Sequence, residues 1–180
     1  WDGERDFTMQ LITRESRRLT YDAWSEVGAP APAELRTASE DYEAFMDERD
    51  YSLLTYNELL PETRELAESV ASGNDNVYDR AVAIQRWLSS NNFLYTRDLP
   101  PLPPHFTIDS FLMQTRRGHC ELFASAMALM LRSLGVPARV VTGYRGGEWN
   151  PSDASFTVRA SMAHLWVEVL FPEHGWVIFD

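Results

Sequence analysis

Lysine is missing from this 180-residue chain, and all sixteen basic residues are arginine. The protein therefore offers no lysine amine of its own to any reaction that consumes amines. Acidic residues outnumber the basic ones, which gives a formal net charge of −11. Because nucleic acids are bound through a basic face, this balance argues against nucleic acid as a partner.

Cysteine is scarce as well, with a single residue at position 120. This excludes a disulfide within the chain and a zinc site built from several cysteines, but it does not fix the cellular compartment. No run of 18 apolar residues occurs, so no segment is expected to span a membrane. The chain starts at Trp1 rather than Met and stops at Asp180 within an apolar run, so we expect it to be part of a longer polypeptide.

The composition is that of one globular domain, with 44% hydrophobic residues. Signals of order are weak in residues 1–60, which we expect to form an N-terminal extension. Its segments 7–12 and 19–24 alternate loosely, as strands do, and 34–50 is an acidic linker whose charges are typical of a solvated face. We expect the core to occupy residues 61–180.

Helix signals become clear where this core begins. A proline in the first position predicts a helix over residues 61–71, and Asn74 or Asn76 caps a second helix that runs to about residue 90. The strongest signal covers residues 120–134, where a wide apolar stripe ends at a glycine. Helices therefore occupy the first half of the core.

Strand signals follow the helices. Residues 145–155 are rich in glycine and polar side chains and predict a loop, and residues 156–159 are a candidate strand. The clearest strands are expected at 138–144, 164–171 and 176–180. Helices first and strands later indicate an α+β fold with a mainly antiparallel sheet.

Cys120 is expected in the first turn of the strongest helix, directly after a glycine and a histidine. A helix N-terminus carries partial positive charge and unpaired N–H groups, which favour the reactive thiolate and can stabilise an oxyanion. Gly118 would let backbone and substrate approach closely. The alternative is a buried structural cysteine, a common role for a lone thiol.

A catalytic thiolate needs a base, and there are four histidines to consider. His105 and His174 are predicted in loops. His119 is adjacent to Cys120, but neighbouring side chains on a helix diverge. His164 opens a predicted strand and could be held by the sheet, although a histidine at a strand end is more often structural.

Asp180 ends the last predicted strand, where a carboxylate after an apolar run needs a partner. If 172–175 form the hairpin loop, Val167 pairs with Asp180, and the carboxylate faces away from His164. A loop longer by one residue, or a bulge, pairs Trp166 with Asp180 instead. Asp180 then lies diagonal to His164 on the same face, within side-chain reach. The sequence leaves both registers open.

Four motifs in this order resemble the transglutaminase-like superfamily, and in particular the bacterial TgpA-type membrane proteins. The resemblance extends from about residue 61 to 180 and is strongest from 115 onward. The motifs are Arg117-Gly-His-Cys-Glu-Leu-Phe-Ala-Ser125, Leu131-Arg-Ser-Leu-Gly-Val-Pro-Ala-Arg-Val-Val-Thr-Gly-Tyr144, Ala163-His-Leu-Trp-Val-Glu-Val169 and Gly175-Trp-Val-Ile-Phe-Asp180.

This resemblance implies a papain-like transglutaminase core, in which a helix bearing the cysteine packs on a sheet bearing the histidine and aspartate. It assigns Cys120, His164 and Asp180 to a catalytic triad, with no cofactor and no metal. It further implies a parent inner-membrane protein of a bacterium, with this domain soluble on the periplasmic side. The substrate would be a protein or a cell-envelope molecule with a glutamine-type amide, and an amine would be the acyl acceptor.

Several functions remain open. The first is a protein-glutamine gamma-glutamyltransferase, which forms a thioester and resolves it with an amine; the second is an amidase or protease, which resolves it with water. A silent binding module is a third class, and a zinc site at His119, Cys120, His164 and Asp180 fits no standard spacing. Substrate-binding residues are unknown, with His119, Tyr144 and Trp166 as candidates. Trp149, Trp166 and Trp176 could line a dry cleft, although core packing is the commoner role.

Overall fold

The predicted helices lie where their end signals place them. In this computed structural model, which describes residues 28–46, 51, 61–99, 101 and 103–180, helix α3 spans Pro61–Ala71 and helix α4 spans Val77–Leu88. The Asn76 side chain accepts a 2.9 Å hydrogen bond from the backbone N–H of Asp79. Of the two candidate caps, Asn76 is therefore the one that starts α4.

Helix α6, Cys120–Ser133, is the central helix of the core. It is preceded by α5 (Ile108–Ser110), by a π-helical turn η1 (Phe111–Thr115) and by the short strand β2 (Arg117–Gly118). Strand β2 pairs in parallel with β1, Leu94–Tyr95. Gly135 follows the helix with φ +76°, a left-handed conformation that suits glycine and ends α6 close to the predicted position.

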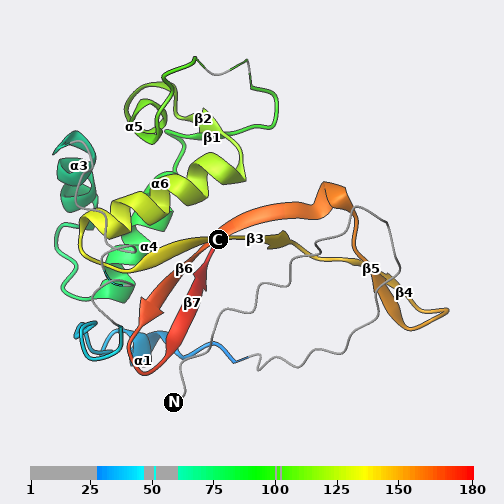
Figure 1. Cartoon of the computed structure of the whole chain (residues 1–180), viewed down its shortest axis with the longest axis horizontal. Helices are drawn as coiled ribbons and strands as arrows, with labels where there is room; N and C mark the ends of the chain where they lie inside the picture. Colours follow the sequence, from blue (N-terminus) through cyan, green and yellow to red (C-terminus); the bar gives the residue numbers. More distant parts are fainter. Residues whose placement is uncertain (1–27, 47–50, 52–60, 100, 102) are drawn as a thin grey trace.

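Three strands form the main sheet, in the order β3-β6-β7, and all neighbours are antiparallel. They are β3 (Ala138–Tyr144), β6 (Ala163–Phe171) and β7 (Gly175–Phe179), with a 3-10 turn η2 (Ala160–Met162) directly before β6. Figure 1 shows α4 and α6 gathered on one side of this sheet. The α+β prediction with a mainly antiparallel sheet is confirmed.

The loop predicted at 145–155 is wrong in part, because it contains a second hairpin. Strand β4 (Glu148–Asn150) pairs with β5 (Ser155–Thr157), so the candidate strand at 156–159 begins one residue earlier and is shorter than expected. The rings of Trp149 and Phe156 pack across the hairpin with centroids 4.9 Å apart. Figure 1 shows this hairpin reaching away from the main sheet. Three-residue strands are too short for a periodic signal.

The N-terminal part is described only in places. Helix α1, Pro32–Leu35, overlaps the start of the predicted acidic linker. Its Leu35 is buried against the core, while most of its neighbours are exposed. The candidate strands at 7–12 and 19–24 lie outside the described residues. In the part of the chain that is described, no helix is long and apolar enough to cross a membrane.

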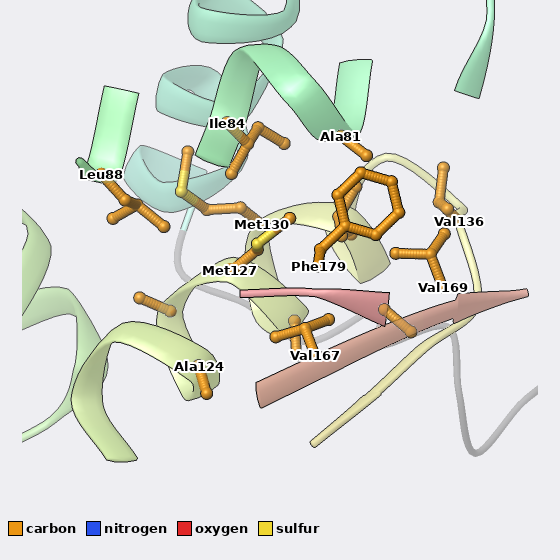
Figure 2. Close-up of a cluster of buried hydrophobic side chains, with 14 of the residues drawn as sticks. Ala81, Ile84, Leu88, Ala124, Met127, Met130, Val136, Val167, Val169 and Phe179 are labelled. Atoms are coloured by element: carbon orange, nitrogen blue, oxygen red, sulfur yellow. The ribbon is translucent and has the colours of Figure 1, made fainter. Parts of the chain in front are cut away.

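The core lies between the sheet and the two helices α4 and α6. Val167 and Val169 of β6 and Phe179 of β7 contribute from the sheet, and all three are almost fully buried. Figure 2 shows them facing buried side chains of the helices, which include Ala81, Ile84, Leu88, Ala124, Met127 and Met130. Because β6 carries its apolar side chains at alternate positions, the same strand is left with a second face for polar residues.

Candidate active site

Cys120 is the first residue of α6 and its side chain is partly exposed. The structure therefore does not support the alternative in which Cys120 is a buried structural cysteine. The backbone N–H groups of Leu122 and Phe123 donate to the carbonyl of His119, which precedes the helix. Among the described residues, the His119 side chain makes no capping hydrogen bond, so it does not occupy the N–H groups of the first turn.

Gly118 is needed for this helix start because the backbone passes very close to the first turn. A Cβ atom at this position would lie 2.8 Å from Leu122 Cδ1 and 3.2 Å from a ring carbon of Phe111. The parallel pair β1–β2 holds the same segment, and the Thr96 N–H donates to the Gly118 carbonyl at 2.7 Å. The position of Cys120 is thus set by packing on one side and by strand pairing on the other.

Three aromatic rings pack together near the start of helix α6. The Phe111 and Phe123 centroids are 5.1 Å apart, and Phe93 lies 5.5 Å from Phe111 and 6.0 Å from Phe123. Such tilted contacts add to the stabilisation from buried area. These contacts join helix α6, the π-helical turn and the segment before β1 to one another.

His164 is the second residue of β6 and it is hydrogen bonded to Asp180. The distance from His164 Nε2 to Asp180 Oδ1 is 2.7 Å, and the exposed fractions of the two side chains are 14% and 32%. Because a carboxylate only accepts hydrogen bonds, the simplest arrangement has Nε2–H donate to Asp180. The other ring nitrogen, Nδ1, is then available to a reacting group.

The register of the β6–β7 hairpin explains this contact. Phe171 pairs with Gly175 and Val167 with Phe179, so the next step of the ladder sets Trp166 opposite Asp180. This is the second of the two registers that the sequence left open, but the expected cause was wrong: the loop is one residue shorter than 172–175, not longer, and the ladder has no bulge. Only residues 172–174 lie between the paired ends, and Glu173 and Gly175 both have positive φ, at +71° and +78°. The tight turn brings the carboxylate onto the face that carries His164.

Two residues that the sequence analysis missed also hold Asp180. Arg145 Nη1 lies 3.0 Å from Asp180 Oδ2, and the Gln85 side-chain amide donates to the main-chain oxygen of Asp180 at 2.9 Å. The Arg145 N–H donates to the Met162 carbonyl, which extends the β3–β6 pairing by one step. Arg145 could have been considered from the sequence, because it is charged and directly follows β3, the strand that pairs with the strand carrying His164. No local pattern points to Gln85.

Trp166 lies two residues after His164 and therefore on the same face of β6. Their ring centroids are 6.5 Å apart, and the planes differ by 29°. Gly143 pairs with His164 on the neighbouring strand, and a Cβ atom there would lie 2.5 Å from Cη2 of the Trp166 ring. The missing side chain at 143 thus makes room for the indole beside the imidazole.

We expect Gly143→Ala to lower kcat about tenfold and to destabilise the fold by about 1–3 kcal/mol, because the indole must move from its site beside His164. Steady-state kinetics and denaturant unfolding measure the two effects. Gly28→Ala is the matched control, since a Cβ atom there meets no atom within 4 Å. Unchanged kinetics in Gly143→Ala would show that the indole has no part in orienting the imidazole.

A cleft of about 700 Å³ joins these residues. Cys120, His164 and Asp180 all line it, together with Arg145, Gln85 and a mainly apolar wall. Of the candidate substrate-binding residues, Trp166 lines the cleft, whereas His119 and Tyr144 do not. Trp149 is exposed on the second hairpin, and Trp176 lies under the Arg139 guanidinium at 4.2 Å. Of the three tryptophans considered as lining a dry cleft, Trp166 is therefore the one that lines it.

The second hairpin is joined to this cleft at both of its ends. Arg145 lies on the chain leading into β4, and Ser161 and Met162 lie on the chain returning to β6. Arg159 and Glu148 form a salt bridge of 2.9 Å between the two arms. The hydrogen bonds from Arg159 hold the pKa of the Glu148 carboxyl below its usual range.

Within the described residues, no group of three His, Cys, Asp or Glu side chains is arranged to hold a metal ion.

Known proteins resemble this chain over most of its length. Residues 64–180 match the family profile described as the Transglutaminase-like superfamily. The chain is 39% identical over 120 residues to a protein-glutamine gamma-glutamyltransferase of Pseudomonas aeruginosa, and 41% identical over 128 residues to protein YebA of Bacillus subtilis. Each match covers 67% of this chain but only 18% and 17% of the relative.

Solved structures of other proteins have a fold similar to that of this chain. The crystal structure of the periplasmic domain of TgpA from Pseudomonas aeruginosa superposes with a TM-score of 0.67 at 36% identity, over 77% of this chain and 48% of that one. A candidate cysteine protease from Cytophaga hutchinsonii superposes with a TM-score of 0.59 at 23% identity, over 82% of this chain and 46% of that one. The latter likeness concerns the fold alone.

Proposed function

The chain belongs to the transglutaminase-like superfamily, and on that premise we propose that it is a thiol-dependent acyl transferase of the protein-glutamine gamma-glutamyltransferase type. The observation that carries the proposal is the shared cleft. It is lined by a partly exposed thiol at a helix start and by an imidazole that is hydrogen bonded to a carboxylate. Nucleophile, base and orienting group are the parts that covalent acyl transfer requires.

In the proposed reaction, the Cys120 thiolate attacks the carbonyl carbon of a glutamine side-chain amide. The C–N bond then breaks, and the imidazolium of His164 gives its proton to the departing ammonia. A thioester remains on Cys120. An amine attacks this thioester, His164 takes up the proton of the amine, and the C–S bond breaks to release the new amide and the thiolate.

The contacts of Asp180 suit the proposed role of His164 as the group that gives and takes the proton. Its Oδ1 accepts from Nε2 of His164, which keeps the ring in the tautomer with Nδ1 free for the thiol and for the leaving group. Of the first-turn N–H groups of α6, those of Leu122 and Phe123 donate to the His119 carbonyl, so we assign the stabilisation of the carbonyl oxygen to the N–H groups of Cys120 and Glu121. Preorganised donors of this kind stabilise the oxyanion without reorganisation during the reaction.

The setting of the domain forms part of the proposal. We place the catalytic core at residues 61–180 and treat 1–60 as an extension. The similarity to a periplasmic domain supports a periplasmic position on a membrane-anchored bacterial protein. In that setting a protein or a cell-envelope molecule with a glutamine-type amide would be the acyl donor, with an amine as the acceptor.

Hydrolysis is the second candidate, and one feature of the cleft favours it. Arg97 and Arg145 both line the cleft, and their positive charge opposes the approach of a cationic lysine amine. Water meets no such barrier. The two reactions share every step up to the thioester, so they differ only in the acceptor.

The test measures both acceptors in one assay. The protein is incubated with a glutamine-containing peptide, with and without a labelled primary amine, and ammonia release and label incorporation are followed. We expect ammonia release in both conditions, with incorporation when the amine is present. Ammonia release without incorporation would assign an amidase instead.

A catalytically silent binding module would release no ammonia. It would also show ordinary thiol behaviour toward iodoacetamide, with the same alkylation rate in His164→Ala as in the unaltered protein. Rapid alkylation at pH 6.5 that is lost in His164→Ala supports the enzyme. Equal and slow alkylation of both proteins would end the proposal.

A further inference from the structure

The charges that line the cleft differ in sign from those of the molecule as a whole. The chain carries a formal net charge of −11. Yet the charged side chains lining the cleft are Arg97, Arg145 and Asp180, with His164 able to add a positive charge. Asp180 is committed to His164 and Arg145. The cleft therefore offers cationic groups to a ligand and no uncommitted carboxylate from its lining.

Strand pairing holds the segment that carries Arg97 against the segment that leads into Cys120. In the parallel pair β1–β2, Tyr95 pairs with Gly118, and the Thr96 N–H donates to the Gly118 carbonyl at 2.7 Å. The Thr96 hydroxyl in turn accepts from the Asp98 N–H at 3.1 Å, which closes a local turn around Arg97. Arg97 and Cys120 both line the cleft.

Arg97 is also free to receive a ligand. It makes no salt bridge with any residue of the described chain, and it is exposed. Arg145 also lines the cleft, where it uses one nitrogen for the Asp180 carboxylate while most of its side chain remains exposed. A guanidinium offers five donors in a planar fork that matches a carboxylate.

We propose that the acyl donor of this site is anionic: a peptide that carries a carboxylate within a few residues of its reactive amide, with Arg97 as the group that binds this carboxylate. The inference rests on the proposed function, since it names the donor of that same cleft. The net negative charge of the molecule does not oppose it at short range, because physiological salt screens exposed charges beyond about 8 Å. Asp98 and Glu121 adjoin the two key residues in sequence but do not line the cleft.

The experiment compares peptides that are identical except for the residues flanking one glutamine, which are glutamate, threonine or lysine. A fourth peptide places the glutamine next to a free C-terminal carboxylate, and a fifth carries the amidated terminus, so that side-chain and terminal carboxylates are distinguished. We expect kcat/KM for the glutamate peptide to exceed that for the threonine peptide by about tenfold, and the lysine peptide to be the poorest donor.

Variants of Arg97 assign the preference to this residue. Arg97→Gln should reduce the glutamate-over-threonine ratio to about one, and Arg97→Glu should reverse it in favour of lysine. Arg117→Gln is the matched control, because Arg117 is an exposed arginine on the neighbouring strand β2 that does not line the cleft. It should keep the preference. Equal kcat/KM for all peptides, or a preference that survives Arg97→Glu, would overturn the proposal.

A second measurement separates this inference from the proposed function. Each peptide is tested for protection of Cys120 against iodoacetamide, which reports binding without turnover. Stronger protection by the acidic peptides supports the anionic donor even if no ammonia is released, in which case only the acyl-transfer activity fails. Turnover of all peptides with equal protection by all of them leaves the activity standing and ends the inference.

Discussion

We expect Cys120→Ala to lower the proposed acyl transfer by about five orders of magnitude or more, because the thioester cannot form and only binding and the helix N-terminus remain to assist the reaction. Cys120→Ser is expected to be nearly as inactive, since a serine hydroxyl in this site is a much weaker nucleophile than the thiolate. Ammonia release and amine incorporation measure the loss.

The fold should survive this change. Cys120 is partly exposed at the first position of α6, and alanine has the highest helix propensity. The melting temperature is therefore expected to stay within a few degrees of that of the unaltered protein. Ser125→Ala is the matched control, since it removes one polar atom from the same helix at a position that does not line the cleft. Substantial activity in Cys120→Ala would show that another group attacks the amide.

Asp180→Asn is expected to lower kcat by about three to four orders of magnitude while changing KM little, because the asparagine keeps the shape but loses the charge. The carboxylate accepts from Nε2 of His164 at 2.7 Å and fixes the tautomer of the ring. An amide can present its NH₂ group to Nε2 instead, which favours the wrong tautomer. The imidazolium that forms during the reaction also loses its counter-charge.

Two comparisons isolate this effect. Arg145→Gln removes the second partner of Asp180 and should lower kcat by about tenfold, because Gln85 and His164 still hold the residue. Asp153→Asn removes a carboxylate from the exposed turn of the second hairpin, where it accepts from the Ser155 hydroxyl, and should leave kcat unchanged. If Asp180→Asn keeps more than a tenth of the activity, the carboxylate is not what orients the base.

Local signals predicted most of the core. Pro61, Asn76 and Gly135 mark ends of helices α3, α4 and α6 because their backbone preferences and hydrogen-bonding groups act within a few residues. The strand predicted at 164–171 likewise corresponds to β6, in which Val167 and Val169 are buried. These features need no knowledge of the rest of the chain.

The hairpin β4–β5 and the contacts of Asp180 were out of reach of such signals. The hairpin depends on a ring pair, Trp149 and Phe156, whose members are separated by a turn. Gln85 meets Asp180 across a sequence separation of 95 residues, through the packing of α4 on the sheet. Neither contact produces a periodic pattern of apolar residues that could be recognised in the sequence.

The order of the motifs around Cys120, His164 and Asp180 was enough to indicate the superfamily, and the family match confirms that part. The sequence by itself also determined the helix ends and the α+β class, because those depend on neighbours in the chain. Only the tertiary structure decided that the β6–β7 register turns Asp180 toward His164, and that Arg97 and Arg145 face the same cleft as the thiol. A shift of one residue in that pairing would move the carboxylate to the other face of the sheet, and the difference depends on turn geometry and packing rather than on residue type alone.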